Sequence, residues 1–315
     1  MKRFLSFGNF FIGIAIISLT LILIFLPNYN MLEFLNEYML HYVLFLLFSG
    51  LIGLIIQNKF ILYISFGCAF MLTLFLKYNS NTDLKLPKPN NQPTLGLIHI
   101  NLSSISGIED LQRLLKDQAY DVISFQEYTP DWTEVLQEVF VDSFPYKHLD
   151  VQLTYHGKAI FSKHSLNVKP DVILNDIEAL HLELNKGGEI YQLISVYLTP
   201  PLNEKDKKAN EKEITHLTNV VSSLAAPTFV FGELNRVYWA KPVIQFRKQS
   251  LMMNSRRNAP LSFKTSYNHI FYSGDMECYH FEDVFDKSNV TIGCRGLYQK
   301  KKSRLPKRKF RKDEN

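Results

Sequence analysis

Apolar residues dominate the first quarter of the chain. Residues 4–26 contain no charged side chain, and two further uncharged runs cover residues 39–56 and 60–76. A helix over the first run would be about 34 Å long, enough to cross a hydrocarbon core of roughly 30 Å. The pattern therefore predicts a transmembrane anchor of three helices within residues 1–77. The alternative for the first run is a cleaved signal peptide, but no small-residue cleavage site follows Leu26.

The positive charges beside these runs predict how the anchor is oriented. Lys2 and Arg3 precede the first run, and Lys59 lies between the second and the third. The first loop, residues 27–38, has two Glu and neither Lys nor Arg. Short loops with Lys and Arg stay in the cytoplasm. We therefore expect the N-terminus inside and the chain after residue 77 outside the cytoplasm. No charge lies within a run, which favours an anchor over a channel.

From residue 94 onward, short apolar runs alternate with amphipathic segments. Before them, residues 78–93 hold three prolines and predict an extended linker. Strands are expected at residues 95–100, 121–125, 159–161, 179–184, 190–198, 228–231 and 268–272. Helices are expected at residues 108–115, 129–139, 203–224 and 241–250. Mixed strands and helices of this extent predict one layered α/β sandwich over residues 94–299.

The net charge of +5 comes from the end of the chain. Residues 300–315 contain nine Lys or Arg and two Asp or Glu, so the remainder is slightly acidic. Such a basic tail binds anionic lipid or nucleic acid, or is a solvated end, and its one aromatic residue makes nucleic acid the weakest of these. Three cysteines are too few for a disulfide scaffold. Cys278 and Cys294 either pair in an oxidising compartment or stay as two buried thiols.

Polar residues lie at the ends of several expected strands. They are Asn101 in HINL, Glu127 in SFQE, Tyr197 in VYLTPP, Glu233 and Asn235 in GELN, and Asn268 and His269 in NHI. In this order, and with GKAIFSKHSL between them, the motifs resemble the endonuclease/exonuclease/phosphatase superfamily. Each motif is weak alone, but together they cover about residues 95–298. The resemblance implies a DNase I-like four-layer α/β sandwich. Three spans before such a domain look like a bacterial arrangement anchored in the inner or plasma membrane.

The same resemblance implies metal-dependent hydrolysis of phosphoesters. Glu127 matches the carboxylate of the family that holds Mg²⁺ or Mn²⁺, hard cations that prefer oxygen ligands, and Asn101 matches the amide beside it. Asn235 matches the Asn that contacts the phosphate. Tyr197 stands where many relatives have His, and its hydroxyl still donates to a phosphate oxygen. The metal and phosphate half of a site is therefore expected here.

The other half departs from the family pattern. Glu233 stands in place of the Asp of Gly-Asp-x-Asn, which moves the charge by about one methylene, and Asn268 stands in place of the Asp that orients the catalytic histidine. That histidine belongs to a Ser-Asp-His motif, which we match to residues 293–295. Arg295 there stays protonated and cannot act as a base.

The remaining histidines offer little to replace this base. His269 is either a rescue base or a buried core histidine. The others, His156 among them, have no metal-ligand spacing and are expected to be surface or packing residues. Losing a general base typically costs ~10²–10⁴ in rate. We therefore expect a membrane-anchored phosphoester hydrolase by descent with reduced or lost activity. The alternative is an inactive binding or scaffold module for a phosphate-bearing ligand.

Overall fold

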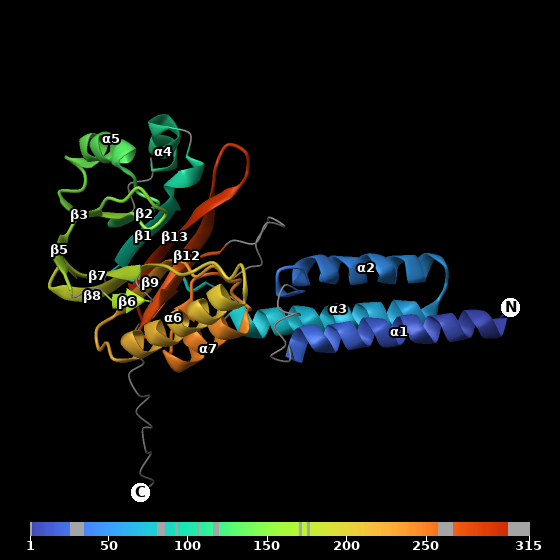
Figure 1. The fold of residues 1–315 in the computed structure, drawn as a ribbon. Helices are drawn as coiled ribbons and strands as arrows, with labels where there is room; N and C mark the ends of the chain where they lie inside the picture. The colour runs from blue at the N-terminus through green and yellow to red at the C-terminus, as the bar shows by residue number, and fades with distance from the viewer. Residues whose placement is uncertain are drawn as a thin grey trace, which may run out of the picture.

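The computed structural model describes most of the chain. The described residues are 2–25, 35–80, 86–91, 94–105, 107–115, 120–169, 172–174, 177–257 and 267–301. Nearly all of the expected basic tail and parts of the expected linker and of the first loop lie outside them. Within them, a bundle of helices precedes a domain built on two β-sheets (Figure 1).

All three apolar runs form helices. These are α1 (Lys2–Phe25), α2 (Met39–Ile55) and α3 (Lys59–Ser80), and α3 packs against both of the others. By length and composition, residues 8–25 of α1 and 59–79 of α3 are long and apolar enough to cross a membrane. α2 has 17 residues and is a shorter apolar helix. Since α3 runs to Ser80, the first residues of the expected linker are helical.

The domain is a sandwich of two sheets. One sheet has the order β12-β13-β1-β2-β4-β3, and we call it sheet A. The other, sheet B, has the order β10-β11-β9-β8-β7-β5, with β6 paired to β7. Strands of sheet A are β1 (Thr94–Asn101), β2 (Val122–Gln126), β3 (Tyr146–Asp150), β4 (Lys158–Ser162), β12 (Met276–Phe285) and β13 (Thr291–Lys300). Strands of sheet B are β5 (Ser165–Val168), β7 (Ile177–Lys186), β8 (Glu189–Tyr197), β9 (Thr228–Glu233), β10 (Met253–Asn254) and β11 (Asn268–Tyr272), and β6 is Val172–Leu174.

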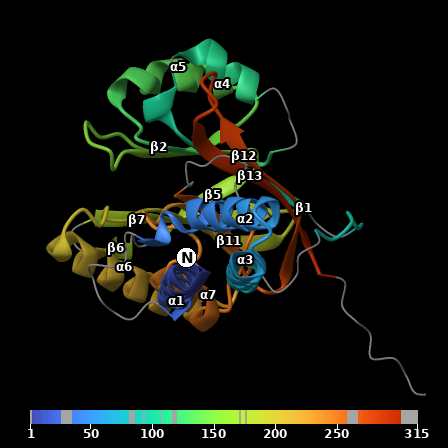
Figure 2. The ribbon, with the colours of Figure 1, turned by 90° about the vertical axis from the view of Figure 1, so that its right-hand side faces the viewer.

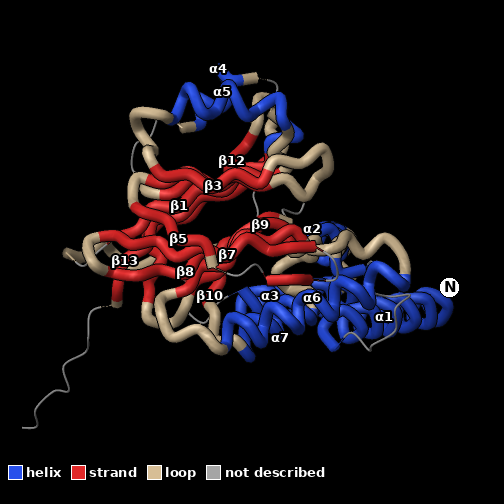
Figure 3. Tube along the Cα trace, turned by 60° about the vertical axis from the view of Figure 1, so that its left-hand side comes forward, coloured by secondary structure: helices blue, strands red, loops and turns tan. Residues whose placement is uncertain are grey.

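Helices cover the outer face of each sheet, so the expected four layers are confirmed (Figures 1 and 3). α4 (Ile108–Leu114) and α5 (Pro130–Phe140) lie over sheet A, and α6 (Glu204–Ser222) and α7 (Lys241–Gln249) over sheet B. The alternating pattern of β1 explains this arrangement, because Leu95 and Leu97 join the core between the sheets. Ile98 and Ile100 join the core beneath α4 and α5 instead.

Every strand expected from the sequence is present, and the pattern missed the long β12–β13 hairpin. Its strands, MECYHFEDVF and TIGCRGLYQK, carry charged residues and glycines among few apolar ones. β13 nevertheless pairs with β1 on one side and with β12 on the other, so it is an interior strand of sheet A. Tertiary pairing, rather than local hydrophobic alternation, makes this segment an interior strand.

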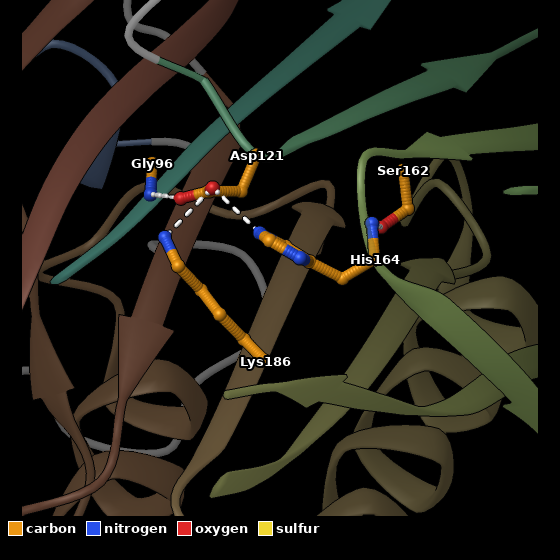
Figure 4. Close-up of polar contacts among 5 residues, drawn as sticks. All are labelled: Gly96, Asp121, Ser162, His164 and Lys186. Atoms are coloured by element: carbon orange, nitrogen blue, oxygen red, sulfur yellow. Dashed lines mark hydrogen bonds and ion pairs between the residues drawn. The ribbon is translucent and has the colours of Figure 1, made fainter. Parts of the chain in front are cut away.

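An ionic cluster joins the two sheets at one end of the sandwich (Figure 4). Asp121, just before β2, lies 2.7 Å from the Lys186 ammonium of sheet B and 3.0 Å from Nε2 of His164. Its other oxygen accepts a hydrogen bond from the backbone N–H of Gly96 in β1. Because Gly96 is near the start of β1 and Asn101 ends it, the cluster lies at the opposite end of the strands from Asn101.

The helix bundle is packed directly on the domain. The indole N–H of Trp239, six residues past the end of β9, donates a 2.8 Å hydrogen bond to the carbonyl of Asn36, before α2. One continuous cluster of buried apolar residues includes Leu23 and Leu76 of the bundle and Trp239 and Val243 of the domain. The bundle therefore projects from one side of the domain, as Figures 1 and 2 show.

Candidate functional site

Asn101 connects two carboxylates that come from different sheets. Its Nδ2 donates to Oε1 of Glu127 at 2.9 Å and to Oε1 of Glu233 at 3.1 Å. Its Oδ1 accepts from the backbone N–H and the hydroxyl of Ser103, at 2.9 and 2.8 Å. Both hydrogens of the amide are thus directed at carboxylates, and the amide plane is fixed by Ser103.

The strand pairing explains why these residues converge. β1 and β2 are parallel and place Asn101 beside Gln126, so Glu127 follows at the same edge. In sheet B, Glu233 at the end of β9 lies level with Tyr197 of the parallel strand β8 and with Asn268 of β11. Carboxyl ends of parallel strands meet at one edge of a sheet, where polar groups form sites.

Strained backbone occurs at two of these residues. Glu127 has φ of 57° and Asn235 has φ of 53°, in the left-handed region that non-glycine residues seldom occupy. Such conformations cost of order 1–3 kcal/mol and are concentrated at functional sites. Gly232, before Glu233, has φ of 123°, and a Cβ there would lie 2.0 Å from the carbonyl oxygen of Val196. The glycine of GELN is therefore needed where β9 passes β8.

The two carboxylates form a donor set that suits a hard divalent cation. Burial raises the pKa of Glu233, and the neighbouring charge of Glu127 raises it further, while hydrogen bonds from Asn101 and Asn268 oppose this. Mg²⁺ commonly takes one or two protein carboxylates and completes its shell with water and phosphate. Glu127 and Glu233 fit that role, because a cation between them would offset their repulsion. Asn101 turns its nitrogen toward them, so its amide orients the carboxylates.

The described chain contains no cluster of three or more His, Cys, Asp or Glu side chains with metal-ligand geometry. Two carboxylates with amide neighbours are therefore the candidate set for a cation in this part of the protein. The carboxylate oxygens at this edge are ligands that hard cations prefer, unlike the Cys and His ligands typical of structural zinc sites.

Tyr197 and Asn235 form the polar wall next to the carboxylates. Burial raises the pKa of Tyr197 to about 12, with the charges of Glu233 and Glu127 adding to it, so its hydroxyl stays protonated at neutral pH. Asn235 is hydrogen-bonded to that hydroxyl and donates from Nδ2 to the carbonyl of Leu198 at 2.7 Å. Both side chains carry N–H or O–H donors, which are the groups that bind phosphate oxygens.

Buried polar residues of α6 support both site loops, and sequence reasoning missed them. Glu213 accepts from the backbone N–H of Thr199 at 2.7 Å and from its hydroxyl at 2.6 Å. Asn210 donates to the carbonyls of Thr199 and Leu234, at 2.9 and 3.0 Å. The available signal was their spacing, since both lie on the apolar stripe that continues through Ile214 and Leu217.

His156 is a second residue that the sequence interpretation missed. Its ring lies 5.8 Å from the ring of Tyr197 and 4.1 Å from that of Tyr155, measured between centroids. Burial, with a smaller effect of Lys158, lowers its pKa, and its Nδ1 accepts no hydrogen bond from the described residues. The signal was the adjoining Gly157, whose Cβ would lie 2.1 Å from the carbonyl oxygen of Tyr128. That close approach holds the loop beside Glu127.

His269 lies away from the carboxylates. Its Nε2 is 2.8 Å from the carbonyl oxygen of Arg236, its ring packs against Phe271, and 1% of it is exposed. Burial lowers its pKa to about 4. Consecutive residues of a strand face opposite sides, so Asn268 reaches Glu233 and His269 points into the other face of sheet B. The structure thus places His269 as a core histidine.

The C-terminal strand brings no base to this edge. Arg295 is paired with Ile98 of β1, three residues before Asn101. Its side chain forms an ion pair with Glu282 and lies over the ring of Tyr120. Gly293 is level with Ile100, so the register continues to the buried Ile292 beside Asn101. The match of the Ser-Asp-His motif to residues 293–295 is therefore displaced from the site.

The two domain cysteines do not pair. Cys278 and Cys294 are free and buried, and they lie opposite Tyr298 and Asp283 respectively. Burial raises the pKa of both thiols. Of the two alternatives drawn from the sequence, the structure has two separate buried thiols.

Comparison with known proteins agrees with this architecture. The sequence profile of the Endonuclease/Exonuclease/phosphatase family matches residues 98–288. No curated protein matches the chain. Among solved structures, an endonuclease/exonuclease/phosphatase from Beutenbergia cavernae is 11% identical with a TM-score of 0.54, covering 66% of this chain and 72% of its own.

Two further structures are similar over the same domain. A family protein from Bacteroides thetaiotaomicron is 14% identical with a TM-score of 0.52, covering 68% of this chain and 100% of its own. The human Nocturnin catalytic domain with bound sulfate anion is 12% identical with a TM-score of 0.50, covering 68% and 97%. At these identities the likeness concerns the fold, and the chemistry depends on the residues described above.

Proposed function

Because the chain belongs to the endonuclease/exonuclease/phosphatase family, we propose that it is a metal-dependent phosphoester hydrolase with reduced turnover, anchored in a membrane. The observation that carries this proposal is the shared hydrogen bonding of Glu127 and Glu233 to one nitrogen of Asn101. It supports a cation site with the phosphate donors of Tyr197 and Asn235 beside it.

In this proposal each residue has a separate role. Glu127 and Glu233 hold Mg²⁺ or Mn²⁺, which when bound supplies positive charge to a phosphate oxygen. Asn101 keeps the two carboxylates together. Tyr197 and Asn235 donate hydrogen bonds to the phosphate and stabilise the charge that grows on it during the reaction.

The reduction in turnover follows from the proton acceptor. On β13, Gly293 is level with Ile100 and is preceded by the buried Ile292, and His269 is turned into the core. Among the nine histidines, all within the described chain, His156 is the one whose ring is seen to contact Tyr197. Its place beside Tyr197 and its lowered pKa, which favours the neutral ring, make it the candidate to accept a proton from water.

The membrane anchor is supported by the apolar helices α1 and α3. In the proposed orientation the N-terminus is cytoplasmic and the α/β domain is extracytoplasmic, in a bacterial inner or plasma membrane. The charge pattern around the runs supports this side, since Lys2, Arg3 and Lys59 flank the cytoplasmic ends.

An inactive phosphate-binding module is the second candidate function. The absence of a base from β13 favours this binding module, because the carboxylates and the donors of Tyr197 and Asn235 would hold a metal-bound phosphate without activating water. The two candidates predict the same metal dependence of binding and differ in whether a product is formed.

One set of measurements tests both candidates. The full-length chain in detergent micelles is assayed with Mg²⁺ or Mn²⁺ on bis(p-nitrophenyl) phosphate, and inorganic phosphate binding is followed by calorimetry. We expect slow, metal-dependent product formation that Glu127→Gln removes and that the exposed control Glu138→Gln on α5 leaves unchanged. Metal-dependent phosphate binding without product would favour the binding module. Neither binding nor product would overturn both.

A further inference from the structure

Two loops beside the candidate site carry exposed leucines. Leu153 in the β3–β4 loop is 87% exposed, and Leu202 in the β8–α6 loop is 85% exposed. Among the side chains whose exposure the structure describes, these are the most exposed large apolar ones. Burying such side chains gives favourable free energy, so two of them on loops next to one site offer apolar area to a partner.

Both loops are held against the wall of the site. Tyr155, two residues after Leu153, packs its ring 5.1 Å from the ring of Tyr197. On the other loop, Glu213 binds both the backbone and the hydroxyl of Thr199, three residues before Leu202. The leucines therefore stand on two supported loops, one packed against Tyr197 through Tyr155 and one that begins just after Tyr197, and we call Leu153, Tyr155 and Leu202 the apolar rim.

The rim belongs to the same strand edge that meets the helix bundle. Trp239, which binds the carbonyl of Asn36 before α2, follows Asn235 by four residues in the loop after β9. Asn235 in turn binds the carbonyl of Leu198 at the start of the loop that carries Leu202. Figure 1 shows the bundle projecting from one side of the domain. If α1 and α3 span a bilayer, its surface therefore lies next to this edge.

We propose that the apolar rim enters the bilayer that holds the bundle and that the phosphoester is the headgroup phosphate of a membrane phospholipid. This rests on the proposed function and adds its substrate class. The rim receives the apolar part of the lipid, and the donors of Tyr197 and Asn235 receive the phosphate. The oxygen of a water molecule bonds to phosphorus, the P–O bond to the glycerol oxygen of the diacylglycerol breaks, and that oxygen takes up a proton, so the products are diacylglycerol and the phosphorylated headgroup. Exposed leucines on two loops next to the phosphate wall, on the edge adjoining the anchor, carry the assignment.

Contact of the rim with lipid is tested without any activity. Leu153→Cys and Leu202→Cys are labelled with an environment-sensitive fluorophore in full-length protein in phospholipid nanodiscs, since Cys68, Cys278 and Cys294 are all buried. Val168→Cys is the matched control, because it is apolar, 55% exposed and on β5, at the far side of the domain from the bundle (Figure 1).

We expect the labels at positions 153 and 202 to shift to the blue and to be quenched by nitroxide-bearing lipids, with no change at position 168. Equal behaviour at all three positions overturns the proposal. The proposal is also overturned if labels at positions 153 and 202 quench each other between molecules in lipid-free micelles, because a second copy of the chain would then cover the rim.

The substrate class is tested by comparing two presentations of a phosphoester. The protein is reconstituted into phosphatidylglycerol vesicles. There the double variant Leu153→Ser/Leu202→Ser is expected to release headgroup on the order of tenfold or more slowly than the wild type. It should leave bis(p-nitrophenyl) phosphate hydrolysis unchanged, as should Val168→Ser. Hydrolysis of the soluble ester without any rim-dependent lipid hydrolysis overturns the lipid assignment alone. Failure to hydrolyse either substrate overturns the proposed hydrolase. The fluorescence experiment then still tests whether the rim contacts lipid, because it does not depend on activity.

Discussion

The carboxylate of Glu233 in sheet B accepts a 3.1 Å hydrogen bond from Nδ2 of Asn101 in sheet A. Since the same nitrogen also binds Glu127, one amide holds two buried or half-buried acids together across the sandwich. Water-exposed acids would separate, and buried ones repel unless a proton or a cation is shared. The site is therefore expected to respond strongly to pH and to divalent metal.

Glu233→Gln should stabilise the metal-free protein at neutral pH. Burial raises the pKa of Glu233, so its contribution to stability is fully present below the ordinary pKa of glutamate and is lost as pH rises from there through the raised pKa. The amide keeps Oε1 as acceptor for Asn101. Thermal unfolding should show a midpoint a few degrees higher than wild type at pH 7 and a smaller difference near pH 4. A lower midpoint at pH 7 would contradict this account.

Divalent metal should raise the melting temperature through Glu127. A ligand that binds only the folded state at 100 times its dissociation constant adds about 2.7 kcal/mol of stability. Millimolar Mg²⁺ or Mn²⁺ should therefore raise the midpoint of the wild type by several degrees, and Glu127→Gln should remove most of that rise. Glu138→Gln serves as the control, since its carboxylate is exposed on α5. An identical metal response in all three proteins would exclude Glu127 as a ligand.

His156→Gln should lower metal-dependent turnover by ~10²-fold or more if His156 accepts the proton from water. The pH–rate profile of the wild type should then rise with pH below the ordinary histidine pKa, because burial lowers the pKa of His156. His148→Gln, at a half-buried histidine of β3, is the control. A variant with unchanged rate and pH profile would show that His156 only packs against Tyr197.

Acid should destabilise the domain through its buried histidines. Burial lowers the pKa of His99 and of His269 to about 4, so each favours the folded state when neutral. That stability is present above pH 6.5 and is lost as pH falls toward 4, by about 3 kcal/mol for each group. His269→Gln should make the fall in melting temperature between pH 7 and 4.5 shallower. An unchanged slope would show that His269 does not titrate on unfolding.

Reporter fusions at the C-terminus should place the α/β domain outside the cytoplasm. Three spans with Lys2 and Arg3 inside leave the chain after Lys77 on the opposite side. In a bacterial host, an alkaline phosphatase fusion should therefore be active and a green fluorescent protein fusion exported through the same route should be dark. The reverse result would favour two spans, α1 and α3, with α2 lying outside the membrane.

The sequence by itself determined the layout of the chain and half of the site. The uncharged runs are long enough to predict helices. Polar residues at or just after the ends of apolar strands, namely Asn101, Glu127, Glu233 and Asn235, predict a cluster of polar groups at one sheet edge. These are local properties, since a strand and the residue that ends it are adjacent in the chain. For the same reason the motif around Tyr197 was recognisable without a structure.

Only the tertiary structure decided which neighbouring side chains share a face and which distant loops meet. Strand alternation requires Asn268 and His269 to point apart, but packing against Arg236 and Phe271 selects His269 as the one that faces away from the carboxylates. Pairing of β13 with β1 sets the level of Arg295 away from Asn101. The contacts of His156 with Tyr197 and of Trp239 with Asn36 join segments far apart in sequence, and no local pattern encodes such distances.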